Sequence, residues 1–72
     1  MRYMVIIEQG KHSFGAYVPD LPGCIAVADS KNEVLELLQE AIEFHLEGLQ
    51  EQGLSVPPPL SSSEYLEIAR AI

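Results

Sequence analysis

The sequence contains few basic residues and a single cysteine. Lysine and arginine together number 4, against 11 aspartates and glutamates, so the formal net charge of the 72-residue chain is −7 at pH 7. The basic residues are scattered, whereas proteins that bind nucleic acids present a clustered basic face to the phosphates. Cys24 has no second cysteine with which to form a disulfide, which is typical of the reducing cytoplasm. We therefore expect a cytoplasmic protein that does not bind nucleic acid directly.

Signatures of membrane, metal and cofactor sites are missing too. No stretch approaches the roughly 20 apolar residues that a membrane span requires. A zinc site needs three or four closely spaced ligands, but the chain offers one cysteine and two distant histidines. The residues before the expected helix, Ala28-Asp29-Ser30, lack the repeated glycines that cradle a phosphate. Cys24, Ser13 and the serines at 61–63 have no base whose position the sequence fixes. We expect no metal, no cofactor and no enzymatic activity.

Three short apolar segments predict β-strands in a single domain that covers residues 1–72. The first runs from Arg2 to Glu8 and the second from Phe14 to Val18, and a polar loop with a glycine separates them, as in a hairpin. Two prolines, an aspartate and a glycine in the segment 19–23 predict a turn. The third strand is expected over Cys24–Ala28.

One long helix is expected to follow the strands. Ser30 and Glu33 form the S-x-x-E pattern of a capping box, which marks a helix start. The helix is predicted to run to about Gln52 and to end at Gly53, because the prolines at 57–59 prevent it from resuming. The pattern after residue 60 fits either a short second helix or a fourth strand, and periodicity does not decide between them.

Glutamates form a stripe along this helix. At about 100° per residue, six of them fall within an arc of roughly 80°; they are Glu33, Glu36, Glu40, Glu43, Glu47 and Glu51. Like charges at this spacing destabilise a helix by a few tenths of a kcal/mol per pair, and no Lys or Arg within the helix follows Lys31. The stripe is therefore either a solvated outer face or a docking surface for a basic protein.

The apolar side of the helix is wider than one sheet requires. It covers roughly 200° of the helical wheel, whereas a surface helix needs little more than 100°. We therefore expect part of it to pack against a second copy of the chain, with a homodimer favoured. The residues expected at this interface are Leu37, Leu38, Phe44 and Leu49. His45 lies within the same arc and is interpreted as a core or interface residue rather than a metal ligand, because no second ligand stands four residues away.

The order of these motifs resembles the HicB-like antitoxin family. The resemblance covers about Tyr3 to Pro59 and rests on four features in sequence: the PDLPGC turn at 19–24, the capped helix, the segment AIEFHLEGL at 41–49, and the exit from Gly53 to Pro57. Ala28 stands where the family has a glycine.

The resemblance implies an α+β fold of order β-β-β-α-β, with a small antiparallel sheet, one long helix on one face and a partial ribonuclease-H-like topology. It favours a fourth strand at Tyr65 to Arg70. It also implies a type II toxin–antitoxin role, in which the chain sequesters a small basic HicA-type ribonuclease that cleaves messenger RNA. We assign partner binding to Asp20, Glu36, Glu40, Glu43 and Glu47. Many members add a C-terminal DNA-binding domain that represses their operon, which we do not expect in this chain.

Two other functions remain open from the sequence. A vestigial or active nuclease of ribonuclease-H type would show Mg²⁺- or Mn²⁺-dependent cleavage that is lost in Asp20→Asn. An orphan interaction domain would bind an unrelated protein. A gene for a small basic protein beside this one would favour the antitoxin over both.

Overall fold

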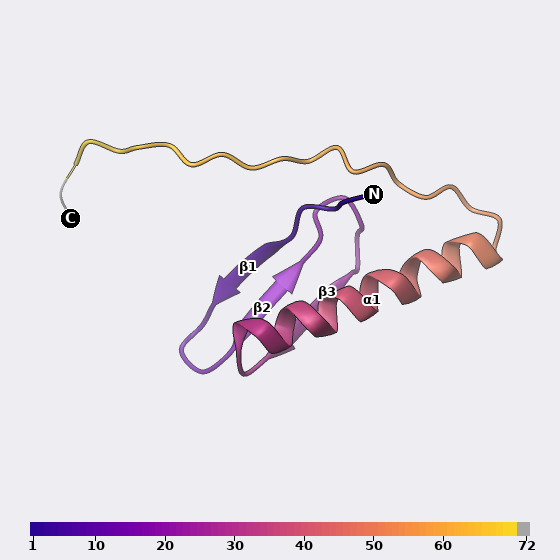
Figure 1. Cartoon of the computed structure of the whole chain (residues 1–72), viewed down its shortest axis with the longest axis horizontal. Coiled ribbons are helices and arrows are strands. Elements are labelled where there is room, and N and C mark those ends of the chain that lie inside the picture. The colour runs from indigo at the N-terminus through magenta and orange to yellow at the C-terminus, as the bar shows by residue number, and fades with distance from the viewer. Residues whose placement is uncertain (71–72) are drawn as a thin grey trace.

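A three-stranded sheet with one helix on one face forms the body of the molecule. The computed structural model describes residues 1–70. The strands are β1 (Ile6–Gln9), β2 (Phe14–Tyr17) and β3 (Ile25–Ala28), and they are followed by the helix α1 (Lys31–Glu51). The sheet is antiparallel in the order β1-β2-β3, and α1 packs on β3 and β2 (Figure 1). The predicted α+β class and the order β-β-β-α are confirmed.

The first strand is shorter than predicted because its partner ends. Ile6 pairs with Tyr17 and Gln9 pairs with Phe14. Continued at this register, residues 2–4 would face residues 19–21, which belong to a segment whose two prolines lack the N–H that a ladder needs. That segment folds into a turn instead, in which the Cys24 amide donates to the Leu21 carbonyl at 3.1 Å.

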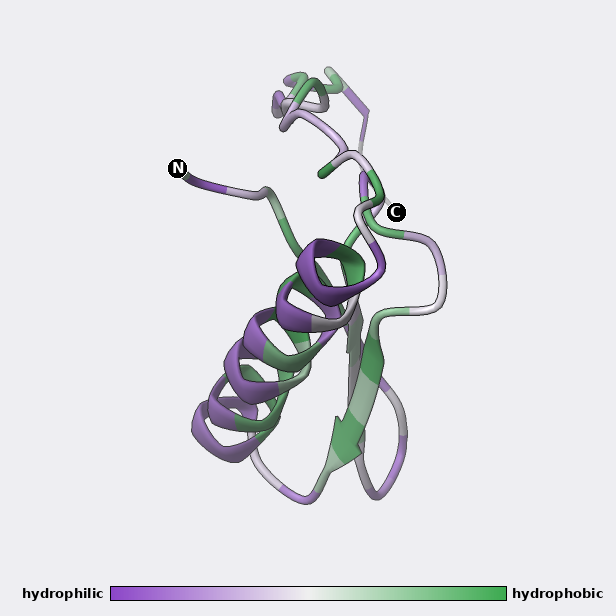
Figure 2. Cartoon of the chain, turned by 90° about the vertical axis from the view of Figure 1, so that its right-hand side faces the viewer, coloured by the Kyte–Doolittle hydropathy of each residue, from purple (hydrophilic) through white to green (hydrophobic). Residues whose placement is uncertain are grey.

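The core lies between the inner face of the sheet and α1 (Figure 2). Its buried side chains are Ala16, Val18, Leu21, Cys24, Ala28, Val34 and Leu38. Leu21, from the turn, is completely buried, and Leu38 is 1% exposed. The assignment of Leu38 to an oligomer interface is therefore wrong. It lies one turn after Val34 on the stripe that faces the sheet, so it packs within its own chain.

Local hydrogen bonds define both ends of α1, as the sequence predicts. The Ser30 hydroxyl accepts from the Glu33 amide at 3.1 Å. Gly53 has a φ of +69°, which a side chain would disfavour, and its amide donates to Gln50. The Leu54 amide then donates to the Leu49 carbonyl at 2.9 Å, which completes a Schellman motif.

The segment 54–70, called the tail below, forms neither of the expected elements. It contains no helix and no strand, and it runs extended past the sheet (Figure 1). Residues 71–72 of the predicted segment lie outside the described residues. The radius of gyration is 14.7 Å, against about 11 Å for a compact chain of this length. A fourth strand at 65–70 is absent because, among the recorded backbone hydrogen bonds of residues 1–70, none joins the tail to the sheet.

Candidate partner-binding surfaces

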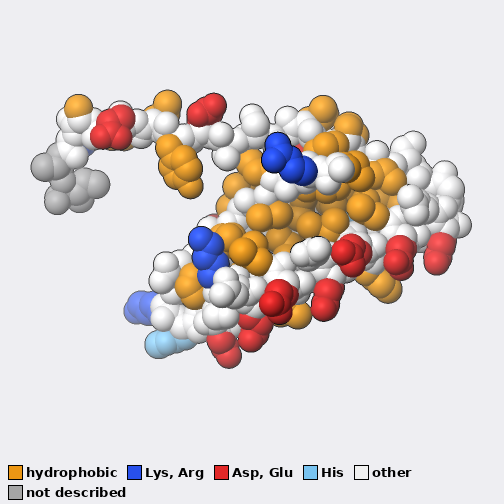
Figure 3. Space-filling model, viewed as in Figure 1, with side chains coloured by type: hydrophobic (Ala, Val, Ile, Leu, Met, Phe, Trp, Pro, Cys, Tyr) orange, Lys and Arg blue, Asp and Glu red, His pale blue; other side chains and the backbone are white. Residues whose placement is uncertain are grey.

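The six glutamates of α1 form one continuous acidic face. All of them are exposed, and Figure 3 shows acidic side chains in a row along the helix. Glu33 lies in the first turn, where the helix dipole favours a carboxylate. Glu47 and Glu51 lie near the opposite end, where the dipole disfavours them, and the last turn contains no basic residue. Apart from Glu33, the acidic face therefore gains no stabilisation from the dipole of its own helix or from a basic residue in the last turn.

The structure brings three of the predicted partner-binding residues to one place. Glu36, Glu40 and Glu43, together with Gln39, line a shallow depression of about 240 Å³. Glu47 is exposed one turn after Glu43. Such an open depression suits the side chains of a protein partner better than a small ligand.

Two exposed apolar side chains border the acidic face. Leu37 is 41% exposed and Phe44 is 78% exposed. They stand seven residues apart, so they lie on the same side of α1, and each is within four positions of Glu40. Leu49, which was expected with them, is half-buried. Apolar side chains next to charged ones are the composition of a protein interface with a polar rim.

Asp20 lies apart from the acidic face and binds the tail. Its carboxylate accepts a hydrogen bond from the Ser61 amide at 2.9 Å and another from the Ser61 hydroxyl at 2.8 Å. These two donors hold the pKa of Asp20 below its ordinary value. The Tyr3 hydroxyl gives a second anchor by donating to the Pro57 carbonyl. Sequence reasoning missed the Asp20–Ser61 contact, since no local pattern links residues 41 positions apart.

The outer face of the sheet is a further apolar surface that sequence reasoning missed. Ile25 is 67% exposed and Val27 is 66% exposed. Tyr17 pairs with Ile25 on one side and with Ile6 on the other, so these large side chains share the face away from α1. Alternation along the predicted third strand already places Ile25 and Val27 on one face and the small residues on the other. It does not indicate which of the two faces α1 packs against.

Cys24, considered above as a nucleophile, and His45, considered as a metal ligand, both lie in positions typical of structural residues. Cys24 is 3% exposed, and burial raises the pKa of its thiol. His45 is half-buried on α1. Within residues 1–70, no three His, Cys, Asp or Glu side chains gather closely enough to hold a metal ion. No helix in the same residues is long and apolar enough to cross a membrane.

Comparison with a solved structure places this fold in a class of toxin–antitoxin proteins. The chain superposes on a chain of a HicA3 and HicB3 toxin–antitoxin complex with a TM-score of 0.68 and 28% identity, over 82% of this chain and 70% of that one. Residues 3–70 also match the model of the HicB-like antitoxin of bacterial toxin–antitoxin systems. The chain therefore belongs to the HicB-like antitoxin family.

Relatives of known sequence occur in a phage and in archaea. A 14.9 kDa protein from the rep-hol intergenic region of Haemophilus phage HP1 is 33% identical over 92% of this chain. The chain spans 50% of that protein's length. A UPF0150 protein of Archaeoglobus fulgidus is 40% identical over 65% of this chain and 70% of its own length. A UPF0150 protein of Thermoplasma acidophilum is 34% identical over 79% of this chain and 84% of its own.

Proposed function

We propose that this chain is an antitoxin that neutralises a small basic HicA-type toxin by binding it, without catalysing a reaction. The observation that carries the proposal is the acidic face of α1 in a member of the HicB-like antitoxin family. The toxins implied by the resemblance are basic and cleave messenger RNA, so the two proteins would meet in the cytoplasm. A negatively charged surface attracts such a protein at long range.

The proposed contact surface combines Glu36, Glu40, Glu43 and Glu47 with the neighbouring apolar residues. Exposed charge pairs contribute under about 1 kcal/mol each, so the glutamates act mainly on the association rate and on orientation. Phe44 and Leu37 are exposed beside them and supply apolar area that the toxin can bury. In this proposal the charges bring the toxin to α1 and the apolar side chains slow its dissociation.

Charge reversal on α1 tests the proposal. In Glu40→Lys/Glu43→Lys, association with the toxin should slow by about tenfold or more, and the remaining rate should depend less on salt. The matched control is Glu8→Lys/Asp29→Lys, which reverses two exposed acids outside α1. Each substitution of an acid by Lys raises the net charge by two, so both double variants have a net charge of −3 instead of −7. Stopped-flow binding at several salt concentrations measures the rates, and circular dichroism checks the fold.

The control makes the outcome specific to the surface. If both double variants slow association equally, net charge rather than the acidic face attracts the toxin. If neither slows it, the toxin binds elsewhere, and the outer sheet face around Ile25 and Val27 is then the surface to test next.

A further inference from the structure

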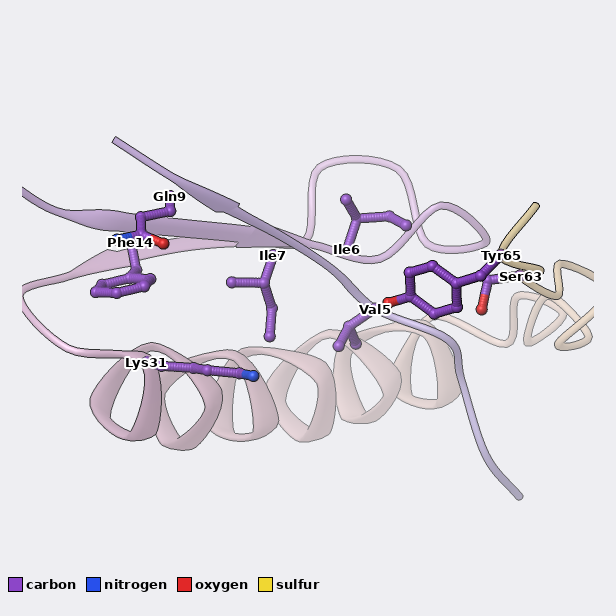
Figure 4. Close-up of a pocket in the computed structure, with 8 residues that line it drawn as sticks. All are labelled: Val5, Ile6, Ile7, Gln9, Phe14, Lys31, Ser63 and Tyr65. Atoms are coloured by element: carbon purple, nitrogen blue, oxygen red, sulfur yellow. The ribbon is translucent and has the colours of Figure 1, made fainter. Parts of the chain in front are cut away.

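Beside β1 lies a cavity that α1 borders only with its first residue, Lys31. α1 packs on β3 and β2, and a space of about 440 Å³ remains next to β1. Ile7 and Phe14 line it from the sheet, Val5 lines it from the position before β1, and Ser63 and Tyr65 line it from the tail (Figure 4). The tail therefore forms one wall of the cavity without filling it.

The same side of β1 has unused backbone hydrogen-bonding groups. β1 is an edge strand with β2 as its one neighbour in the sheet of residues 1–70. The outward N–H and C=O groups of an edge strand are a ready template for another extended segment. The backbone hydrogen bonds recorded for this part of the chain include none between β1 and the tail. The cavity thus combines an apolar floor with an open strand edge, the two features that bind an added strand.

The tail has the complementary properties. It is extended, and its large apolar side chains are exposed: Tyr65 is 99% exposed, Leu66 83% and Ile68 68%. The Asp20–Ser61 contact fixes the direction in which it leaves the body. Such apolar side chains on an extended, unpaired segment indicate that another surface covers them.

We propose that the tail of a second copy of this chain enters the cavity as an added strand on β1, and that the exchange is reciprocal. Under a twofold axis each copy then donates its tail and receives its partner's tail. Each copy's own tail stays at the outer wall, so the two tails lie side by side between the two β1 strands. The result is one continuous sheet in which the open edge of β1 is paired in each of the two copies.

Charge supports a tail of this sequence as the occupant, and the copy's own tail already stands at the wall of the cavity without filling it. Two of the chain's four basic residues lie on this side of the molecule: Lys31 lines the cavity, and Arg2 lines a neighbouring depression with Ser61. The tail supplies Glu64 and Glu67 as their counterparts. Self-association through Leu37 and Phe44 would instead bring two acidic faces together, which like-charge repulsion opposes.

The mass of the free protein tests the exchange independently of any toxin. We expect sedimentation at tens of micromolar to give twice the chain mass of 7.9 kDa. Leu66→Pro/Ile68→Pro removes two strand donors from an exposed segment and should give a monomer that keeps the helical circular dichroism signal of α1 and loses only the signal of the added strands. The matched control, Leu37→Ser/Phe44→Ser, removes two exposed apolar residues from α1 and should remain a dimer. A monomeric wild type, or a dimer that only the α1 variant disrupts, would overturn the proposal.

A second measurement identifies whose tail is bound. In a mixed sample of isotope-labelled and unlabelled copies, nuclear Overhauser effects between the Tyr65 ring and the Val5 and Ile7 side chains should appear across copies. If they appear only within one copy, each tail fills its own cavity as a fourth strand and the exchange does not occur.

Discussion

Adjacent leucines on α1 give the sharpest test of the packing. Leu37 and Leu38 are the same residue type and are neighbours in the same helix. Leu38 lies in the core and is 1% exposed, whereas Leu37 lies at the surface and is 41% exposed. Leu38→Ala should leave a cavity between α1 and the sheet, at a cost of about 2–5 kcal/mol of the free energy of unfolding. Leu37→Ala should cost under about 1 kcal/mol.

These costs are large against the stability of so small a domain. At roughly 0.05–0.15 kcal/mol per residue, the whole chain is stable by about 4–11 kcal/mol. Leu38→Ala should therefore lower the melting temperature by roughly 10 °C or more, since 1 kcal/mol corresponds to about 4–8 °C in a domain of this size. Urea unfolding measures the free energy of unfolding of both variants. The protein concentration is the same for both, so that any association of the chain contributes equally to the two values. Equal costs for the two substitutions would refute the placement of Leu38 in the core and Leu37 on the surface.

Three further predictions concern single contacts. Ser30→Ala removes the helix cap and should cost about 1 kcal/mol in urea unfolding, and no loss would contradict the capping role. The Asp20–Ser61 contact should hold above the ordinary carboxyl pKa and weaken as the pH falls through the lowered pKa of Asp20, so acid should release protection of the Ser61 amide from exchange. Asp20→Asn should abolish that pH dependence, and Asp29→Asn should preserve it. Cys24 should react with a thiol reagent slowly in the native protein and rapidly in denaturant; equal rates would contradict its burial.

Features set by short-range chemistry could be predicted from the sequence. The hydrogen bond from the Glu33 amide to Ser30 and the positive φ of Gly53 each depend on residues a few positions apart, so both ends of α1 follow from local patterns. The acidic face follows from helical periodicity alone, because residues three and four apart share a side of any α-helix.

Features set by distant contacts could not be predicted in this way. The width of the apolar arc showed that α1 has more apolar surface than one sheet covers, but it could not separate buried Leu38 from exposed Leu37. That distinction depends on the rotation of α1 over the small residues of β3. The tail is the clearest case, since its path depends on Asp20 and Tyr3, which lie far from it in sequence.

The most direct test of the antitoxin role is the inhibition of messenger RNA cleavage. A basic HicA-type toxin encoded beside this chain would be assayed on messenger RNA with increasing amounts of the purified chain, and the chain alone would be assayed with Mg²⁺ and with Mn²⁺. The proposal predicts that cleavage stops when the two proteins reach a fixed stoichiometric ratio, and that the chain alone cleaves nothing. Undiminished cleavage at excess chain, or metal-dependent cleavage by the chain that Asp20→Asn abolishes, would contradict it.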